Sequence, residues 1–149
     1  IDRHGNINAT VIGDYHTPKT RLPGSGGSME IAGWANRCYI ITPHQKRRFP
    51  EKVDFITSAG FLSHRKEREA SGARGKGPQG VVTHLGILEP DENGEMILAA
   101  LHPGATIDMI QQNTGWEVKV SANLRETLPP SEEELRILRE DLDPTGIYI

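Results

Sequence analysis

The residues best suited to chemistry in this sequence form a short glycine-rich stretch, Gly24-Ser25-Gly26-Gly27. Glycine adopts positive φ without a steric penalty, and its missing side chain lets another group approach the main chain closely. Ser28 is a suitable N-cap for a following helix. The apolar pattern of that helix is carried by Met29, Ile31, Ala32 and Trp34. Backbone N–H groups at such a helix start suit an anion that is bound or that develops during a reaction. A plain tight turn is the alternative interpretation of the same glycines.

No other pattern in the sequence predicts a nucleophile or a metal site. Ser25 lies in no Gly-x-Ser-x-Gly elbow and has no obvious base near it in the sequence. The histidines are scattered without a His-x-x-x-His pair, so no metal is expected at His4, His16, His44, His64, His84 or His102. The basic runs at 46–48 and 65–76 could hold phosphate, although solvated surface is the commoner role of such runs.

Composition predicts a single globular domain with a reduced thiol. The chain has 149 residues, of which 25% are charged, and its net charge of −3 does not favour nucleic acid as the main partner. No apolar run is long enough to span a membrane. Cys38 is the only cysteine, which excludes an intrachain disulfide and predicts a buried thiol in a reducing, cytoplasmic compartment. Because the chain begins at Ile1, we expect residues 1–149 to be the downstream part of a longer protein whose upstream segment is absent.

Periodicity and turn residues predict an α/β fold with a sheet of mixed direction. In the first half we expect a turn and a strand within 1–12, strands over 38–42 and 53–57, and a helix over 28–36. The 38–42 run is continuously apolar, which is typical of a buried strand. Residues 61–78 carry five basic residues and no apolar periodicity, so they are expected to form a long, mobile surface loop.

The second half predicts a hairpin, a helix and a further strand. Apolar runs at 81–88 and 96–101 flank Asn93-Gly94, the turn dipeptide that favours a β-hairpin. Thr106 is expected to cap a helix that runs to about residue 113. A strand is expected over 117–120.

A final helix is predicted near the C-terminus. Ser131 and Glu134 have the spacing of a capping box, and Asp143-Pro144 should stop the helix. Its apolar face is expected to hold Leu135, Ile137, Leu138 and Leu142.

Several motifs also follow one another in a fixed order along the chain. The first half contains Asp2-x-x-Gly5-Asn6-x-Asn8-x-Thr10, Ile12-Gly13-Asp14-Tyr15-His16-x-Pro18-Lys19-Thr20-Arg21, the glycine stretch, and His44-x-Lys46-Arg47-Arg48-Phe49. The second half contains Gly77-Pro78, Val81-Val82-Thr83, Gly86-Ile87-Leu88, His102-Pro103-Gly104, Asn113-Thr114-Gly115-Trp116-Glu117, Leu138-Arg139-Glu140 and Asp143-Pro144. In this order they resemble the small (β) subunit of glutaconate CoA-transferase, of the type I CoA-transferase family.

The resemblance covers essentially the whole chain and implies a fold, a partner and substrates. The implied fold is an α/β/α sandwich around a mixed, mostly parallel sheet with a β-hairpin. The implied partner is the α subunit of the same enzyme, which would make a hetero-oligomer with its active site near the shared interface. The implied substrates are an acyl-CoA and a carboxylic acid. Coenzyme A therefore enters as a substrate, and no metal is implied.

The implied reaction is a ping-pong transfer through an enzyme thioester. A glutamate carboxylate attacks the acyl-CoA thioester, a mixed anhydride forms, and the CoA thiolate returns to give the enzyme thioester. The family's matching loop stabilises the oxyanion, which assigns that role to Gly24, Ser25, Gly26 and Gly27. Asn6 and Asn8 are candidates for contact with the substrate. The family's nucleophilic glutamate belongs to an upstream motif that nothing here matches, so no catalytic nucleophile is expected in this chain, and Glu30 is expected to be an ordinary helix residue.

Three functions fit this sequence. The first is a CoA-transferase that acts on dicarboxylic or 3-oxo acids, such as glutaconate. The second is a lyase of the same fold that decarboxylates a glutaconyl-type CoA ester, and the third is a non-catalytic binding or scaffold half beside a catalytic partner. Ring-opening relatives depart from Gly-Ser-Gly-Gly, which places this sequence nearer the transferases. The residue at the upstream nucleophile position separates the first two functions.

Overall fold

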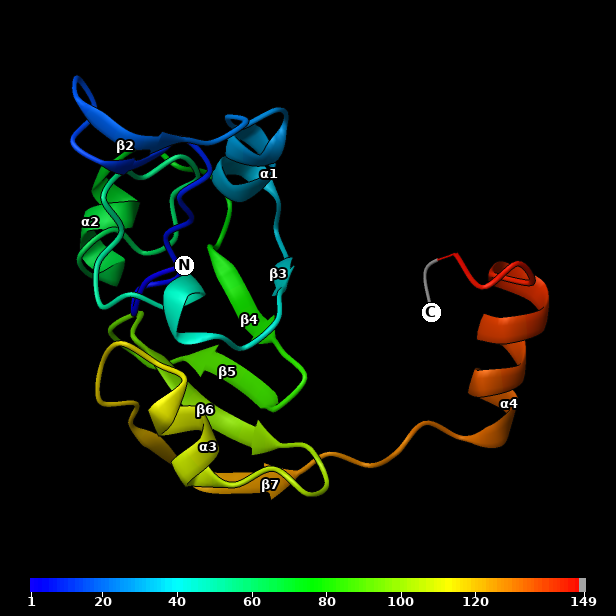
Figure 1. Cartoon of the computed structure of the whole chain (residues 1–149). Coiled ribbons are helices and arrows are strands. Elements are labelled where there is room, and N and C mark those ends of the chain that lie inside the picture. Colours follow the sequence, from blue (N-terminus) through cyan, green and yellow to red (C-terminus); the bar gives the residue numbers. More distant parts are fainter. Residues whose placement is uncertain (148–149) are drawn as a thin grey trace.

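The structure is a computed structural model that describes residues 1–147. Over these residues one sheet has the strand order β3-β4-β5-β6-β7, and a separate antiparallel hairpin, β1-β2, lies at the other end of the body (Figure 1). The strands are β1 Val11–Gly13, β2 Pro18–Arg21, β3 Cys38–Ile41, β4 Pro78–Val82, β5 Gly86–Pro90, β6 Met96–Leu101 and β7 Val120–Glu126. The helices are α1 Ser28–Trp34, α2 Arg65–Ala70, α3 Ile107–Gln112 and α4 Glu132–Arg136, with a 3₁₀ turn η1 at Lys46–Arg48 and a π-helical turn η2 at Ile137–Leu142.

The larger sheet is mixed, as expected, but half of its strand pairs are antiparallel, so it is not mostly parallel. Strand β3 pairs with β4 and β6 pairs with β7 in parallel, whereas β4–β5 and β5–β6 are antiparallel. A parallel pair needs a crossover connection between its strands. The first crossover, residues 42–77, contains η1 and α2, and the second contains α3.

Both crossovers pack on the same face of the sheet. The first contributes Phe49 and Phe61 to the core, and the second contributes Ile110 and Trp116. These side chains meet buried residues of β4, β5 and β6, namely Val81, Leu88, Met96 and Leu98. In Figure 1 the N-terminal segment and α2 lie to the left of the sheet, on this core side.

The expected long loop over residues 61–78 is wrong, because α2 forms in the middle of it. The imidazole of His64 caps this helix by accepting a hydrogen bond of 3.1 Å from the N–H of Glu67. Arg68, which the sequence placed in a solvated basic run, is buried and only 3% exposed. Its guanidinium donates five hydrogen bonds of 2.6 to 3.2 Å to the carbonyls of Ala32, Ala59, Gly60 and Gly75. Backbone acceptors therefore anchor a segment that has no apolar periodicity.

Three local predictions in the second half are confirmed. Strands β5 and β6 form the hairpin, although the 81–88 run divides between β4 and β5, and Gly94 at the turn has a φ of +89°. The hydroxyl of Thr106 caps α3 by accepting a hydrogen bond of 3.2 Å from the N–H of Met109. Ser131 and Glu134 form the capping box at the start of α4.

Three strand predictions are wrong in extent. Residues 53–57 form no strand; next to them Ser58 makes an isolated bridge with Ile7. Within 1–12 the expected turn is present, with the N–H of Gly5 bonded to the carbonyl of Asp2, but the expected strand is reduced to β1, which pairs with β2 where a loop was expected. The strand expected over 117–120 instead begins at Val120. Between residues 7–10 and 57–58, side chains take the place of some strand-to-strand backbone hydrogen bonds. For example, the hydroxyl of Thr57 accepts a hydrogen bond of 2.8 Å from the N–H of Ala9.

Strand β3 is present where the apolar run predicted it, but the prediction that it is buried is wrong. Tyr39 is 60% exposed and Ile41 is 83% exposed, while Cys38 is half-buried. The strand lies at the edge of the sheet, and its outer face receives no covering element from residues 1–147. Tertiary position, not the run of apolar residues, decides this exposure.

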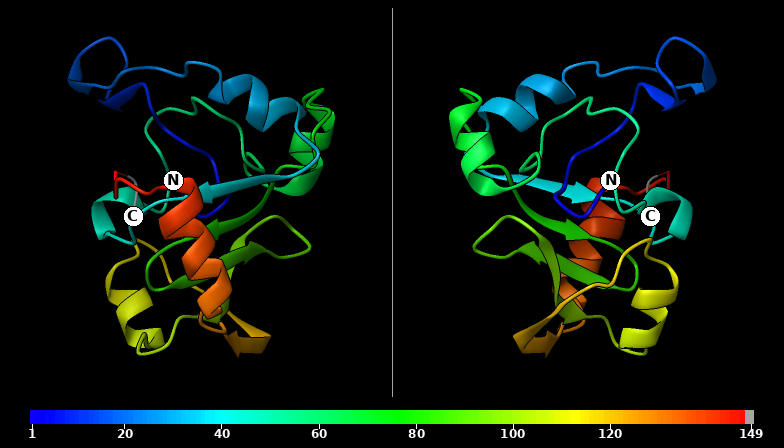
Figure 2. Two further views of the ribbon diagram at one scale, coloured as in Figure 1. Left: turned by 90° about the vertical axis from the view of Figure 1, so that its right-hand side faces the viewer. Right: turned by 90° about the vertical axis from the view of Figure 1, so that its left-hand side faces the viewer.

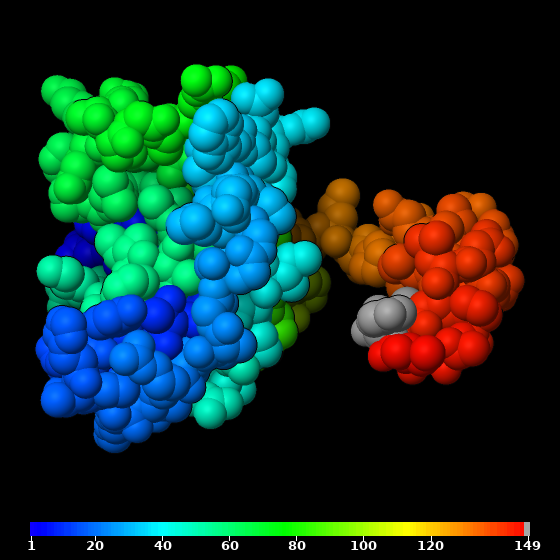
Figure 3. All heavy atoms as spheres, turned by 90° about the horizontal axis from the view of Figure 1, so that it is seen from above, coloured from blue at the N-terminus to red at the C-terminus, as the bar shows by residue number. Residues whose placement is uncertain are grey.

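The C-terminal helix forms an arm that stands away from the body. After β7, residues 127–131 lead to α4 and η2, neither of which has a buried residue (Figure 1). The left view of Figure 2 shows this helix in front of the sheet, and Figure 3 shows open space between the arm and the body. The predicted apolar face of the helix is therefore not packed against the body, although Leu135 and Ile137 are half-buried within the arm itself. Within residues 1–147 no helix has the length and apolar character to cross a membrane.

Candidate active-site loop

The glycine stretch forms a tight turn that leads directly into α1. Gly24 and Gly26 have φ values of +95° and +50°, which a side chain would strain. The N–H of Gly24 donates to the carbonyl of Ala9 at 2.7 Å, and the N–H of Ser28 donates to the carbonyl of Ser25 at 3.0 Å. The expected arrangement of a glycine loop against a helix start is therefore present.

Ser28 does not cap α1, so that prediction is wrong. Gly27 occupies the N-cap position, and no side chain caps the helix. The Ser28 hydroxyl instead bonds the carbonyl of Ser25 at 2.7 Å and lies 2.9 Å from the hydroxyl of Ser58. Ser28 thus closes the turn and links it to the segment before Gly60.

Within residues 1–147, several backbone donors in the loop are free, that of Ser25 included. Among the described residues, the N–H groups of Gly26 and Gly27 have no hydrogen-bond partner, and both residues are exposed. A Cβ built on Gly24, Gly26 or Gly27 would meet nothing within 4 Å. No neighbouring atom of the chain therefore requires glycine at these three positions. Free donors and open space suit a group that approaches from outside.

Arg68 and Ser58 hold the loop's helix in place, and sequence reasoning missed both. The guanidinium of Arg68 donates to the carbonyl of Ala32 in α1 at 2.6 Å and to the carbonyl of Gly60 at 2.7 Å. Burial lowers the pKa of Arg68 from its usual value. The sequence carried no signal for this contact, because an arginine between other basic residues resembles solvated surface.

The side chain of Asn6 is fully engaged inside the protein. Its Oδ1 accepts hydrogen bonds from the N–H groups of Gly60 (2.9 Å) and Leu62 (3.1 Å). Its Nδ2 donates to the carboxylate of Asp2 at 3.0 Å and to the carbonyl of Leu62 at 2.8 Å. Leu62 has a φ of +58°, so Asn6 fixes a strained turn. In this arrangement Asn6 shapes the backbone around the loop, and its contact with a substrate stays a prediction.

Asn8 is likewise bonded to its own turn but lines a surface hollow. Its Oδ1 accepts from the N–H groups of Thr10 and Val11. The hollow beside it, near the start of the glycine loop at Leu22, also contains Arg47, Arg48 and Lys52. These three cations give one wall of the hollow a positive charge, although Asp54 also lines it.

Carboxylates beside the loop and inside the protein are either exposed or already bonded within the chain. Glu30, next to the loop, is exposed on α1, and Asp54 accepts a hydrogen bond of 2.8 Å from the N–H of Gly13. Glu95 binds Arg3 and Lys119 at 2.6 Å each; burial works to raise its pKa, but these two hydrogen bonds hold the pKa below its usual range. Within the described residues there is no cluster of three metal-ligating side chains.

Comparison with known protein families shows to which family the chain belongs. The family described as Coenzyme A transferase matches residues 1–113. The chain belongs to the Coenzyme A transferase family. The resemblance that the ordered motifs suggested is therefore confirmed.

Two curated relatives show where in the family the chain lies. It is 46% identical over 140 residues to the B subunit of 3-oxoadipate CoA-transferase from Pseudomonas knackmussii, covering 93% of this chain and 54% of the relative. It is 43% identical over 151 aligned positions to the B subunit of glutaconate CoA-transferase from Acidaminococcus fermentans, covering 100% of this chain and 56% of the relative. The chain thus spans about half the length of the curated relatives it matches.

Solved structures confirm the CoA-transferase fold. The crystal structure of glutaconate coenzyme A-transferase from Acidaminococcus fermentans matches with a TM-score of 0.90 and 42% identity, covering 100% of this chain and 57% of that chain. The decarboxylase AibA/AibB matches with a TM-score of 0.79 and 26% identity, covering 99% of this chain and 55% of that chain. The decarboxylase is therefore the more distant of the two in both sequence and structure.

Proposed function

We propose that this chain is part of the B subunit of an acyl-CoA:carboxylate CoA-transferase and supplies its oxyanion-binding loop. The observation that carries the proposal is the pair of unpaired N–H groups at Gly26 and Gly27, in an open loop of a Coenzyme A transferase family member. Attack on a thioester places negative charge on the carbonyl oxygen. Backbone donors aimed at that oxygen stabilise the transition state more than the ground state.

The chain's own residues have three tasks in this reaction. Gly26 and Gly27 donate to the oxyanion as the thioester carbonyl becomes tetrahedral, and Gly24 ties the loop to the carbonyl of Ala9. Arg68 and Ser28 keep α1 and the loop in register with the body. Loss of one oxyanion donor typically costs about 3 kcal/mol of transition-state stabilisation.

The proposal places the nucleophile outside this chain. A carboxylate attacks the acyl-CoA, CoA returns to form an enzyme thioester, and a second carboxylic acid then takes the CoA. We propose that this glutamate lies in the part of the B subunit that the chain does not span, and that an A-type subunit completes the site. The isolated chain should then neither form a covalent CoA adduct nor transfer CoA.

The acid substrates are proposed from the named relatives. Subunits of transferases named for glutaconate and for 3-oxoadipate are 43% and 46% identical to this chain, so a dicarboxylic acid or 3-oxo acid is the proposed class. The basic wall formed by Arg47, Arg48 and Lys52 offers cations to an anionic substrate. A cytoplasmic enzyme would find acyl-CoA substrates at hand.

A decarboxylase on the same fold is the second candidate, because the AibA/AibB structure covers 99% of this chain. A lyase would also use an oxyanion loop but would need no carboxylate nucleophile. Borohydride reduces an enzyme thioester, so treating the assembled enzyme with acyl-CoA and borohydride separates the two. A mass change on one glutamate supports the transferase, and CO₂ release without an adduct supports the lyase.

A matched pair of glycine variants tests the loop itself. Gly26→Val should lower kcat in the assembled enzyme by about 100-fold or more, because a side chain at φ +50° strains the loop and blocks the thioester's approach. Gly72 has a φ of +81° and equally open surroundings but lies after α2, outside the loop. Gly72→Val should therefore cost similar stability and leave kcat unchanged. Equal kcat losses in both variants would show that Gly26 matters only for folding.

A further inference from the structure

Two neighbouring hydroxyl groups, at positions 57 and 58, connect to the two ends of the glycine loop (residues 24–27). At the entry end, the Thr57 hydroxyl accepts a hydrogen bond of 2.8 Å from the N–H of Ala9. The carbonyl of Ala9 in turn accepts a hydrogen bond of 2.7 Å from the N–H of Gly24. The hydroxyl of Thr10 lies 2.7 Å from that of Thr57 and ties the same segment a second time. The position of Gly24 therefore depends on Thr57 through one intervening residue.

At the exit end of the loop, Ser58 acts through Ser28. The Ser28 hydroxyl has one hydrogen and donates it to the carbonyl of Ser25 at 2.7 Å. The hydroxyl of Ser58, 2.9 Å away, must then be the donor in its bond with the oxygen of Ser28. Ser58 is fully buried, so bulk water does not compete for this bond. Because linked hydrogen bonds polarise one another, Ser58 strengthens the bond by which Ser28 closes the turn.

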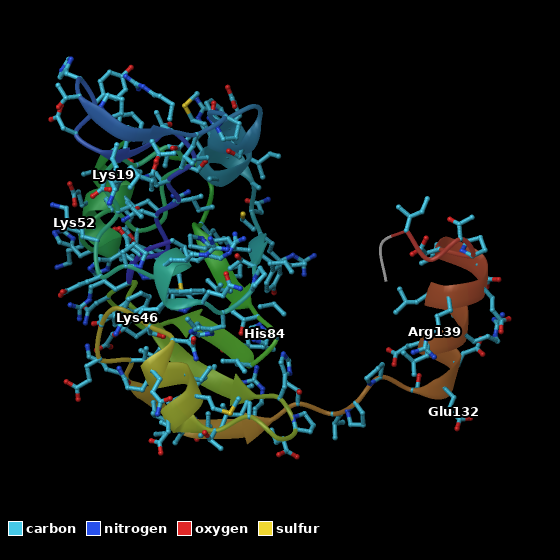
Figure 4. All side chains as sticks on the ribbon, in the orientation of Figure 1. Lys19, Lys46, Lys52, His84, Glu132 and Arg139 are labelled. Carbon is cyan, nitrogen blue, oxygen red and sulfur yellow. The ribbon has the colours of Figure 1, made fainter. Side chains whose placement is uncertain are left out.

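The segment that carries these two hydroxyls is itself fixed to the body. The N–H groups of Thr57 and Ser58 both donate to the carbonyl of Ile7, at 2.8 and 3.1 Å, and the N–H of Ile7 donates to the carbonyl of Ser58 at 2.9 Å. In Figure 4, Lys19 of β2 and Lys52 both lie on the side of the body that faces away from the arm. The strand before the loop and the segment that leads to Thr57 therefore share one side of the body.

The loop needs such support, because its glycines do not fix their own conformation. Glycine has the widest choice of backbone angles, and the space beside Gly24, Gly26 and Gly27 is open. An oxyanion hole requires donors about 2.7–3.1 Å from the reacting oxygen. A displacement of about 1 Å can cost about 100-fold in rate. Groups outside the loop must therefore determine where its free N–H groups point.

We propose that Thr57 and Ser58 are positioning residues for CoA transfer, which hold the two ends of the glycine loop and so aim the N–H groups of Gly26 and Gly27 at the oxyanion. This inference rests on the proposed oxyanion-binding function of the loop. Donors that act on the transition state affect kcat more than the binding of substrate. Loss of either hydroxyl should therefore lower kcat and leave the KM for acyl-CoA nearly unchanged.

Steady-state kinetics of the assembled two-subunit enzyme test the proposal. Thr57→Val and Ser58→Ala should each lower kcat by about tenfold or more, with KM changed by no more than about twofold. Thr57→Ser keeps the hydroxyl and should restore most of the wild-type kcat. Thr114→Val is the matched control, because Thr114 is also buried and its hydroxyl donates to the carbonyl of Ile110 in α3 at 2.7 Å. This control should lower stability and leave kcat unchanged.

Two further measurements separate positioning from folding. Ser58→Ala should add little to the kcat loss of Ser28→Ala, because Ser58 acts through Ser28. Amide hydrogen exchange should speed up at Gly24 in Thr57→Val and at Ser28 in Ser58→Ala, but at neither position in Thr114→Val.

Unchanged exchange at Gly24 and Ser28 would overturn the proposal, and so would faster exchange with an unchanged kcat. A kcat loss in Thr114→Val as large as that in Thr57→Val would also overturn it, because general destabilisation would then explain both. A wild-type assembly that transfers no CoA would overturn the proposed function of the loop. The exchange rates would in that case still support or overturn the hold of residues 57 and 58 on the loop.

Discussion

Arg68 gives the sharpest test of how this chain is held together. Arg68→Met keeps most of the side chain's length but removes five hydrogen bonds to the carbonyls of Ala32, Ala59, Gly60 and Gly75. A buried acceptor that loses its donor costs about 1–3 kcal/mol. At the low end of that range, four unsatisfied carbonyls cost about 4 kcal/mol. Arg68→Met also removes a buried charge, which recovers part of this cost, so the free energy of unfolding should fall by about 3 kcal/mol.

Urea unfolding followed by circular dichroism measures this loss. Lys66→Met on the same helix is the matched control, because Lys66 is exposed and its loss should change stability by no more than about 0.5 kcal/mol. Arg68→Lys should fall between wild type and Arg68→Met, since an ammonium has three donors and cannot span four carbonyls. Hydrogen exchange should speed up in α1 more than in α3, because Ala32 belongs to α1. A stability loss below about 0.5 kcal/mol in Arg68→Met would refute the reasoning.

Two further outcomes follow from the buried histidine and from a crowded glycine. Burial, together with the nearby His84, lowers the pKa of His44 to about 4 from 6.5. As pH falls from 6.5 to 4, the unfolded chain binds a proton at His44 that the native chain does not bind. The free energy of unfolding should therefore fall by about 3 kcal/mol more in the wild-type protein than in His44→Asn. Parallel pH profiles of the two proteins would contradict this. A Cβ on Gly60 would lie 2.3 Å from the backbone carbon of Gly5, so Gly60→Ala should destabilise by at least about 2 kcal/mol. Gly33→Ala, in open space on α1, should not destabilise, and equal melting temperatures for the two alanine variants would refute the clash.

Local sequence signals located the elements whose ends are set by their own residues. The Asn93-Gly94 turn, the Thr106 cap and the Ser131–Glu134 capping box all rest on bonds or conformations within a few residues. The glycine loop belongs to the same class, because positive φ at Gly24 and Gly26 is a property of glycine itself. The order of these motifs was specific enough to indicate the family.

Long-range contacts decided the rest. Arg68 resembled solvated surface in the sequence, yet carbonyls brought together from segments 7 to 36 residues away bury it. The amide of Asn6 is likewise engaged by Gly60 and Leu62, which lie 54 and 56 residues further along the chain. Whether an amide or a guanidinium faces solvent depends on which backbone groups the fold leaves without partners, and no local pattern records that.

Strand β3 also shows which features are local and which depend on tertiary packing. The sequence by itself determined that residues 38–41 form a strand, since β-branched and aromatic residues favour extended backbone. Only the tertiary structure decided that Tyr39 and Ile41 lie on an uncovered edge while Ile40 joins the core. Hydrophobicity sets how strongly a side chain avoids water, but the layers packed against each face of the sheet determine which side chains are removed from it.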